Sequence, residues 1–179
     1  MVFTPKKVCR KDVYCMSAGF HTINLKKIKK IALSIAIPLL IGGVSTFLSG
    51  DQSAVYNNLM QPPLAPPPWL FGVVWPILYV LMGISAYLVS VSNAPEKEKN
   101  KAFVFYWLQL AFNFFWSIWF FRFQLFGFSF LWLIVLLILA IANAVMFYDK
   151  NRAAGWLLVP YIAWLSFAAY LNYMIWVLN

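Results

Sequence analysis

The sequence is poor in charge, and poorest in acidic residues. Only 11% of its 179 residues are charged, with five Asp or Glu against fourteen Lys or Arg. An average soluble domain carries about 25% charged residues. The remaining polar residues are too few to cover a chain that is 63% hydrophobic and contains 17 Phe, 9 Trp and 9 Tyr. This shortage excludes an ordinary water-soluble fold and favours a protein whose solvent is lipid.

Residues that carry conventional chemistry are also scarce. The two cysteines, Cys9 and Cys15, and the single histidine, His21, all lie in a basic N-terminal segment. They form no set at metal-ligand spacing, and the apolar part of the chain has no paired carboxylates and no Ser, His and Asp arrangement. We therefore expect no metal site, no required cofactor and no conventional hydrolytic enzyme.

The positive charge is gathered in clusters. Nine of the nineteen charged residues precede residue 31, and uncharged runs of about 20 residues separate most of the others. A nucleic-acid-binding module would instead distribute Lys and Arg over a surface of its fold. The net charge of +9 thus describes the flanks of membrane spans, and no nucleic-acid partner is expected.

Uncharged runs long enough to cross about 30 Å of hydrocarbon follow one another along the chain. The predicted spans are 31–48, 69–92, 102–121, 128–148 and 154–178. They predict an all-α integral membrane protein, a five-transmembrane-helix bundle over residues 31–179. Residues 1–30 are expected to form a basic, disordered extension, with Met16 as an alternative start. The first run could also be a secretory signal peptide, although it is longer than a typical signal core.

Basic segments lie before the first span, between the second and third spans, and between the fourth and fifth spans, where they comprise Lys150 and Arg152. All three segments fall on one side of the membrane. The positive-inside rule therefore predicts a cytoplasmic N-terminus and a C-terminus on the outside.

The longest predicted loop, 51–68, contains five prolines between Gln61 and Pro68. Prolines fix φ and stiffen the chain, so this loop can hold one shape over the end of the bundle. It could be a rigid spacer, or it could roof a ligand pocket.

Four groups of residues resemble a known family. They are PPLAPPPWLFGVVW at 62–75, LYVLMG at 78–83, FNFFWS at 112–117, and LLVPYIAW at 157–164 followed by FAAYLN at 167–172. In this order and spacing they resemble the TspO/MBR family, the tryptophan-rich sensory proteins related to the mitochondrial translocator protein or peripheral-type benzodiazepine receptor. The resemblance runs from about Lys30 to Asn179. Leu64 departs from it, because many members have Trp at that position.

The resemblance implies a five-helix bundle, often a homodimer, with a pocket beneath the loop between the first two spans. Members bind porphyrins such as protoporphyrin IX, and the mitochondrial branch also binds cholesterol and synthetic drugs. The cholesterol pattern needs a cation soon after a tyrosine near the end of the last span. No cation follows Tyr173, so sterol binding is not expected and a bacterial cytoplasmic membrane is favoured.

Helical spacing gives the shared residues a physical meaning. Gln109, Asn113 and Ser117 recur every four residues and form a polar stripe, which must face either neighbouring helices or a cavity. Trp75 and Trp164 could wall a flat slot for a planar macrocycle, since indole faces suit such a ligand. Simple helix packing is the competing interpretation.

The predicted ligand-binding residues are Trp75, Asn113, Trp116, Trp164 and Ala168. Further candidates for the pocket or loop are Pro66, Pro67, Tyr79, Gly83, Ser117 and Tyr161. The predicted function is porphyrin binding, with a role in trafficking or stress regulation. One alternative is light- and oxygen-dependent porphyrin degradation involving Trp75 and Trp164. A small transporter is a second alternative, disfavoured because the spans contain no charged residue that could couple ion movement.

Overall fold

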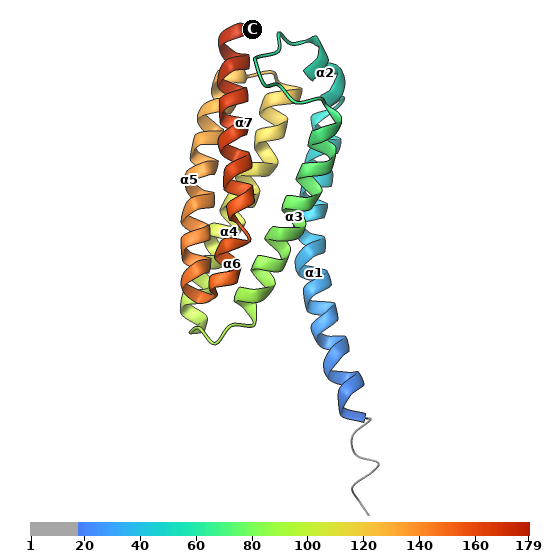
Figure 1. Ribbon diagram of the computed structural model, residues 1–179, viewed down its shortest axis with the longest axis vertical. Helices are drawn as coiled ribbons and strands as arrows, with labels where there is room; N and C mark the ends of the chain where they lie inside the picture. The colour runs from blue at the N-terminus through green and yellow to red at the C-terminus, as the bar shows by residue number, and fades with distance from the viewer. Residues whose placement is uncertain (1–17) are drawn as a thin grey trace, which may run out of the picture.

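The computed structural model describes residues 18–179, and helices are the only regular secondary structure in that range (Figure 1). Five of its helical segments are long and apolar enough to cross a membrane. This confirms the predicted five-transmembrane-helix bundle. The predictions for Cys9, Cys15, Met16 and the side chain of His21 lie outside the described residues.

The spanning helices are α1 (Ala18–Ser49), α3 (Trp69–Ser90), α4 (Glu96–Ser117), α5 (Phe126–Lys150) and α7 (Val159–Leu178). A five-residue π-helix, η1 (Ile118–Arg122), prolongs α4, and the short α6 (Arg152–Trp156) leads into α7. The uncharged runs therefore located every span. Three spans reach beyond those runs at their lysine-bearing ends, because Lys, Glu and Arg are good helix formers outside the hydrocarbon.

Two local expectations are corrected. The predicted extension 1–30 is helical from Ala18 onward, because α1 continues through its lysine segment past the end of the other helices (Figure 1). The predicted loop 51–68 contains a further helix, α2 (Gln52–Asn58). Asp51 starts α2 by accepting a hydrogen bond from Ala54 N at 2.9 Å, which satisfies one of the free N–H groups at the helix start.

Neighbouring helices pack in the order α3, α1, α4, α5 and α7, and α6 fills the space between α3 and α5. Gly83 permits the close crossing of α1 and α3. A Cβ at that position would lie 2.5 Å from Ile35 Cα. Gly83 therefore serves helix packing, as small residues do between membrane helices.

The buried side-chain amide of Asn172 links α7 to α4 and α5. Asn172 on α7 accepts from Trp116 Nε1 at 3.1 Å and from Ser129 Oγ at 3.2 Å, and its own Nδ2 donates to Phe126 O at 2.9 Å. These bonds link α4, α5 and α7 at membrane depth, where an unpaired polar group would be costly.

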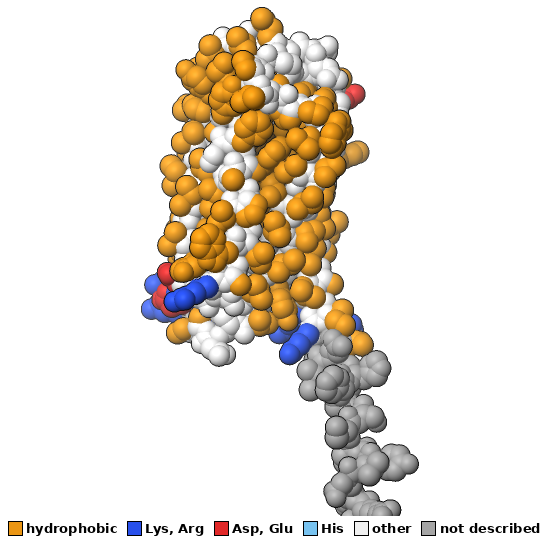
Figure 2. Space-filling model, viewed as in Figure 1, with side chains coloured by type: hydrophobic (Ala, Val, Ile, Leu, Met, Phe, Trp, Pro, Cys, Tyr) orange, Lys and Arg blue, Asp and Glu red, His pale blue; other side chains and the backbone are white. Residues whose placement is uncertain are grey.

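The two ends of the bundle differ in charge (Figure 2). We call the end that carries the α3–α4 and α5–α6 connections the lysine end, and the end that carries α2 the loop end. Ion pairs at the lysine end join Lys99 to Glu96 at 3.0 Å, and Lys101 and Lys150 to Glu98 at 3.3 and 3.5 Å.

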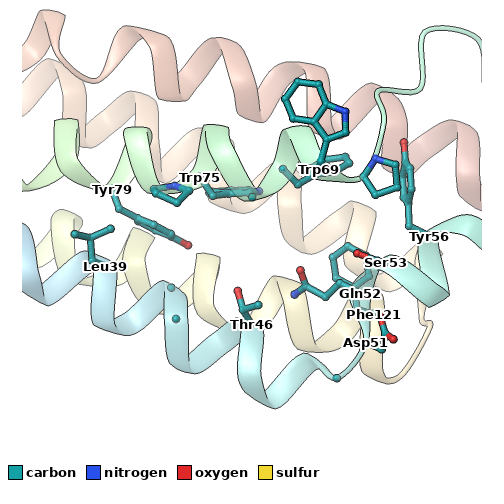
Figure 3. Close-up of a pocket in the computed structure, with 17 residues that line it drawn as sticks. Leu39, Thr46, Asp51, Gln52, Ser53, Tyr56, Trp69, Trp75, Tyr79 and Phe121 are labelled. Carbon is teal, nitrogen blue, oxygen red and sulfur yellow. The ribbon is translucent and has the colours of Figure 1, made fainter.

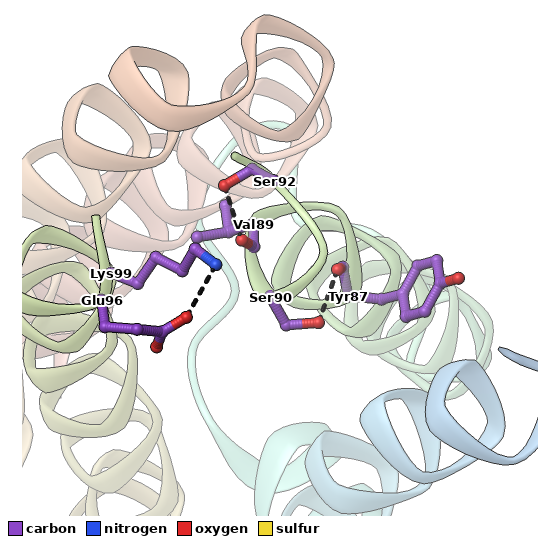
Figure 4. Close-up of polar contacts among 6 residues, drawn as sticks. All are labelled: Tyr87, Val89, Ser90, Ser92, Glu96 and Lys99. Carbon is purple, nitrogen blue, oxygen red and sulfur yellow. Dashed lines mark hydrogen bonds and ion pairs between the residues drawn. The ribbon is translucent and has the colours of Figure 1, made fainter. Parts of the chain in front are cut away.

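Two serine hydroxyls donate hydrogen bonds to backbone carbonyls near the end of α3, at the lysine end (Figure 4). Ser90 Oγ donates to Tyr87 O at 2.7 Å, and Ser92 Oγ donates to Val89 O at 2.8 Å. Tyr87 O also accepts from Val91 N, and Val89 O also accepts from Ser92 N, both at 3.1 Å, so each serine adds a second donor to a carbonyl at the boundary of the span.

Candidate functional site

A cavity of about 620 Å³ lies between α1 and α3 at the loop end of the bundle (Figure 3). Residues of α2 and its N-cap line the end of the cavity nearest the loop, and Phe121 of η1 also lines the cavity. Both α1 and α3 contribute exposed residues to its wall, namely Gly43, Thr46, Gly72 and Pro76. Since α1 and α3 are both membrane spans, the cavity opens sideways between them.

Small and helix-breaking residues leave this space open. Gly43 and Gly72 have no side chain, and a Cβ at either position would meet nothing within 4 Å. Pro76 lies inside α3 and has no N–H to offer the carbonyl of Gly72 one turn earlier. The cavity wall thus contains a backbone acceptor without its usual helical partner.

Trp75 and Tyr79 form the aromatic wall on the α3 side (Figure 3). Their ring centroids are 5.7 Å apart with an interplanar angle of 30°, so the two rings stack along the helix. The Tyr79 ring lies directly against Gly42, where a Cβ would be only 2.1 Å from its Cε2. Gly42 therefore makes room for Tyr79 between α1 and α3.

Behind this wall is a buried hydrogen-bonded chain. The Tyr79 hydroxyl donates to Asn113 Oδ1 at 3.0 Å, and Asn113 Nδ2 donates to the Tyr161 hydroxyl at 3.0 Å. The Tyr161 hydroxyl in turn donates to Gln109 Oε1 at 2.9 Å. The chain connects α3, α4 and α7, and it shows that the inward-facing polar stripe joins helices at Gln109 and Asn113.

The predicted slot between Trp75 and Trp164 is filled by side chains. The Trp75 ring lies 6.2 Å from Trp116 and 6.5 Å from Tyr161. Trp164 packs against Phe71 at 5.9 Å and Phe167 at 5.7 Å. Aromatic rings thus occupy the interface between α3 and α7, and the open volume lies on the other side of Trp75.

Trp164 has one unusual feature within this packed interface. Its Nε1 is buried and has no hydrogen-bond partner among the described residues. Buried indole N–H groups usually have an acceptor. A ligand acceptor that reached this side of Trp75 would find the donor free.

The predicted site residues therefore fall into three groups. Trp75 and Tyr79 line the cavity. Directly behind them are Asn113, Trp116 and Tyr161, all buried, with Ala168 buried and Trp164 half-buried on α4 and α7. The remaining candidates, Pro66, Pro67, Gly83 and Ser117, do not line it.

The cavity also uses residues that were not predicted as site residues. They are Leu39, Gly42, Gly43, Thr46 and Gly50 at α1, Asp51, Gln52, Ser53 and Tyr56 at α2, Pro68, Trp69, Phe71, Gly72 and Pro76 at α3, and Phe121 on η1. The adjacent Gly42 and Gly43 were the signal available in the sequence, because paired small residues in a span mark a close contact or an opening.

Hydrogen bonds from side chains hold the proline-rich segment to α2 and α7, two of them through its own carbonyl groups and one through a carbonyl of α2. The Tyr56 hydroxyl donates to Pro66 O at 3.1 Å, the Tyr170 hydroxyl donates to Pro63 O at 3.0 Å, and Gln61 Nε2 donates to Tyr56 O. Prolines have no N–H, so bonds from side chains to carbonyls are the means left to fix such a segment. Burial raises the pKa of the Tyr56 hydroxyl, which therefore stays protonated as a donor.

Among the described residues, the cavity lining offers one carboxylate and no histidine or cysteine. No cluster of three or more His, Cys, Asp or Glu occurs in the described part of the chain. Asp51 is the one carboxylate in the cavity lining, and it caps α2. The arrangement is suited to binding an apolar, flat molecule by stacking and burial.

Comparison with known proteins relates most of the chain to one family of membrane proteins. The model of the TspO/MBR family matches residues 34–177. "Tryptophan-rich protein TspO" of Chlorobaculum tepidum is 38% identical over 161 residues, which are 86% of this chain and 98% of that protein. The protein of the same name from Archaeoglobus fulgidus is 36% identical over 153 residues, covering 85% and 98%. "Translocator protein" of Homo sapiens is 36% identical over 133 residues, covering 74% and 79%. The five-span bundle and its tryptophan-rich helices thus belong to a member of the TspO/MBR family.

Proposed function

We propose that this membrane protein binds a planar, apolar ligand of the tetrapyrrole type in the cavity between α1 and α3. The observation that carries the proposal is the stacked pair of Trp75 and Tyr79 along a cavity of about 620 Å³. Ligand pockets in proteins have volumes of about 300–1,000 Å³ and are lined mainly by apolar and aromatic groups. A macrocycle can lie flat against this wall.

Apolar burial supplies the binding free energy. Each Å² of apolar surface removed from water contributes about 25 cal/mol. Part of this gain offsets the free-energy cost of association, and the remainder appears as affinity. Few polar groups are needed, and those in the lining, such as Thr46 and Gln52, lie toward the loop end (Figure 3). The ring system therefore faces Trp75 while polar substituents face α2.

The residues behind Trp75 become a second layer of the same site when the Trp75 indole turns aside. Asn113, Trp116, Trp164 and Ala168 would then contact the ligand, as predicted from the sequence. The unpartnered Nε1 of Trp164 supports this deeper position, since a carboxylate or ring nitrogen could accept from it.

A porphyrin titration tests the proposal. We expect Trp75→Ala to weaken the binding of protoporphyrin IX about tenfold, because a large stacking surface is removed. Trp156→Ala is the matched control, since that indole is 65% exposed on α6 at the lysine end. Binding is followed by the absorbance of the porphyrin, so the loss of a tryptophan fluorophore does not interfere. Equal affinities of the two variants would rule out the cavity as the site.

The deeper position has its own test. Trp164→Ala should weaken binding as much as Trp75→Ala only if the ligand reaches the interface between α3 and α7. Wild-type affinity in Trp164→Ala, together with a loss in Trp75→Ala, would restrict the ligand to the open cavity.

Light- and oxygen-dependent degradation of porphyrin is the second candidate function. It is favoured by the contact of Trp75, at the cavity wall, with Trp116 at 6.2 Å, because adjacent indoles can supply electrons to an excited ligand. The purified protein is illuminated with protoporphyrin IX, and a distinct bilin-like absorbance is the expected product signal. Bleaching equal to that with free tryptophan would exclude this activity.

We also propose that the lysine end faces the cytoplasm of a bacterial cell. This orientation follows from the basic residues at that end, Lys97, Lys99, Lys101, Lys150 and Arg152. In a variant in which serine replaces Cys9 and Cys15, Asn57→Cys at the loop end should react with an impermeant maleimide in intact cells. Asn93→Cys should react only after lysis, and the reverse pattern would invert the topology. A homodimer, implied by the family resemblance, stays a prediction.

A further inference from the structure

Two charged residues stand at the loop end among the described residues, Asp51 and Arg122. All other charged side chains of the described residues belong to the lysine end. Asp51 lines the cavity, and Arg122 directly follows Phe121, which also lines it. The cavity lining therefore contains one negative side chain, and the one positive side chain of the loop end among the described residues belongs to the residue next to this lining.

The π-helical turn η1 determines the position of Arg122. Phe123 N donates to Ile118 O and Leu125 N donates to Trp119 O, both at 3.1 Å, so the turn is wider than an α-helical one. Such π-turns occur frequently at functional sites. Here the wide turn places Phe121 in the cavity wall and carries Arg122 across to α1.

Arg122 Nη1 donates to Leu48 O at 3.0 Å, in the last turn of α1. Leu48 lies between Thr46 and Gly50, which both line the cavity. Arg122 itself does not line the cavity, but this bond holds its guanidinium group beside a backbone segment that does. The guanidinium group has five N–H donors, and the described contacts use one of them. Arg122 forms no ion pair with a carboxylate of the described residues.

Two features near Arg122 repel anions. The carboxylate of Asp51 is negative, and the C-terminus of α1 carries the negative end of its helix dipole. Arg122 is the group that can offset both. Guanidinium groups also bind carboxylates through two parallel hydrogen bonds, a geometry that a lysine cannot supply.

We propose that Arg122 is the carboxylate-recognition residue of this cavity, selecting flat apolar ligands that carry an acidic side chain over neutral analogues. The inference rests on the proposed function and specifies its ligand as an anion. The acidic side chain lies at the loop end beside Arg122, and the ring system lies along Trp75.

A matched pair of probes tests the assignment in the full chain: protoporphyrin IX, a dicarboxylic acid, and its neutral dimethyl ester. We expect Arg122→Gln to weaken binding of the acid about tenfold and to change binding of the ester less than about twofold. The acid preference of the wild type should disappear or reverse, because the negative groups remain. Arg122→Lys should restore part of the preference, and Arg152→Gln, at the lysine end, should leave both affinities unchanged.

Asp51→Asn provides the opposite change. Asparagine still caps a helix, so α2 is kept while a negative charge is removed. We expect the acid to bind more tightly to this variant and the ester to bind as before.

Other outcomes separate the two proposals. An equal loss of both probes in Arg122→Gln would assign Arg122 a structural role through Leu48 and overturn the inference. Equal affinity of wild type for acid and ester would overturn it as well, while leaving the cavity proposal intact. Failure of the wild type to bind either probe would overturn the proposed function itself.

Discussion

The side chain of Asn179, at the end of α7, bonds in both directions to the backbone of Met60. Met60 N donates to Asn179 Oδ1 at 2.9 Å, and Asn179 Nδ2 donates to Met60 O at 3.3 Å. Met60 starts the proline-rich segment that follows α2. The last helix thus holds the first residues of the loop over the bundle.

Asn179→Ala should release the loop. Loss of the two bonds, which are exposed, is expected to lower the free energy of unfolding by about 1 kcal/mol. Hydrogen exchange at Met60 should accelerate, and limited proteolysis within 59–68 should become faster. Asn100→Ala, an exposed asparagine at the lysine end, is the control. Identical exchange at Met60 in both variants would show that the bonds do not restrain the loop.

Gly42→Ala should disturb the cavity wall, and Gly43→Ala should not. A Cβ at residue 42 would lie 2.1 Å from the Tyr79 ring, whereas one at residue 43 would meet nothing within 4 Å. Overpacking of this kind costs about 1–3 kcal/mol. We expect Gly42→Ala to lower thermal stability and porphyrin affinity together. Equal behaviour of the two alanine variants would contradict this contact.

Tyr79→Phe should leave Asn113 Oδ1 buried without a donor. Such a group costs about 1–3 kcal/mol, and hydrocarbon offers it no water in replacement. Thermal unfolding in detergent measures the loss, with Tyr87→Phe near the end of α3 as the control. The double variant with Tyr161→Phe should lose less than the sum of the single losses, because both hydroxyls belong to one chain. Strict additivity would show that the two hydroxyls act independently.

The loop should loosen at alkaline pH through Tyr56. Its pKa is raised in the folded protein by burial, so the neutral hydroxyl is favoured there. This contribution to stability is present below the pKa of an unfolded tyrosine, about 10, and is lost as the pH rises through the higher folded value. Proteolysis of 59–68 should therefore accelerate above that range in the wild type. Tyr56→Phe should show fast proteolysis that changes much less with pH, and a parallel profile would assign the transition to another group.

The spans were predictable because each depends on a property of a continuous stretch of residues. An uncharged run long enough for the bilayer has few alternatives, and the lysines mark where it must end. The inward direction of Gln109 and Asn113 was also predictable, because polar groups at membrane depth cannot face lipid.

Features that depend on several helices at once were harder to predict. No local pattern distinguishes the π-turn at 118–122 from the α-helix that it prolongs. Whether Trp75 has open space toward α1 or toward α7 depends on the rotation of three helices and on the ring of Tyr79, which fits only against Gly42. The sequence therefore located one wall of the cavity and missed the other. Helix α2 was a different case, because residues 51–68 were treated as one proline-rich loop although the prolines begin only at Pro62.

The cavity mouth between Gly43 and Thr46 on one side and Gly72 and Pro76 on the other lies between two spans. A ligand of the proposed kind would reach it from the hydrocarbon, so its concentration in the bilayer would govern occupancy. A dissociation constant expressed per litre of buffer will change with the amount of lipid or detergent in the sample. Expressed as a mole fraction of the membrane phase, the same constant should hold across preparations, and affinities of variants are comparable only on that scale.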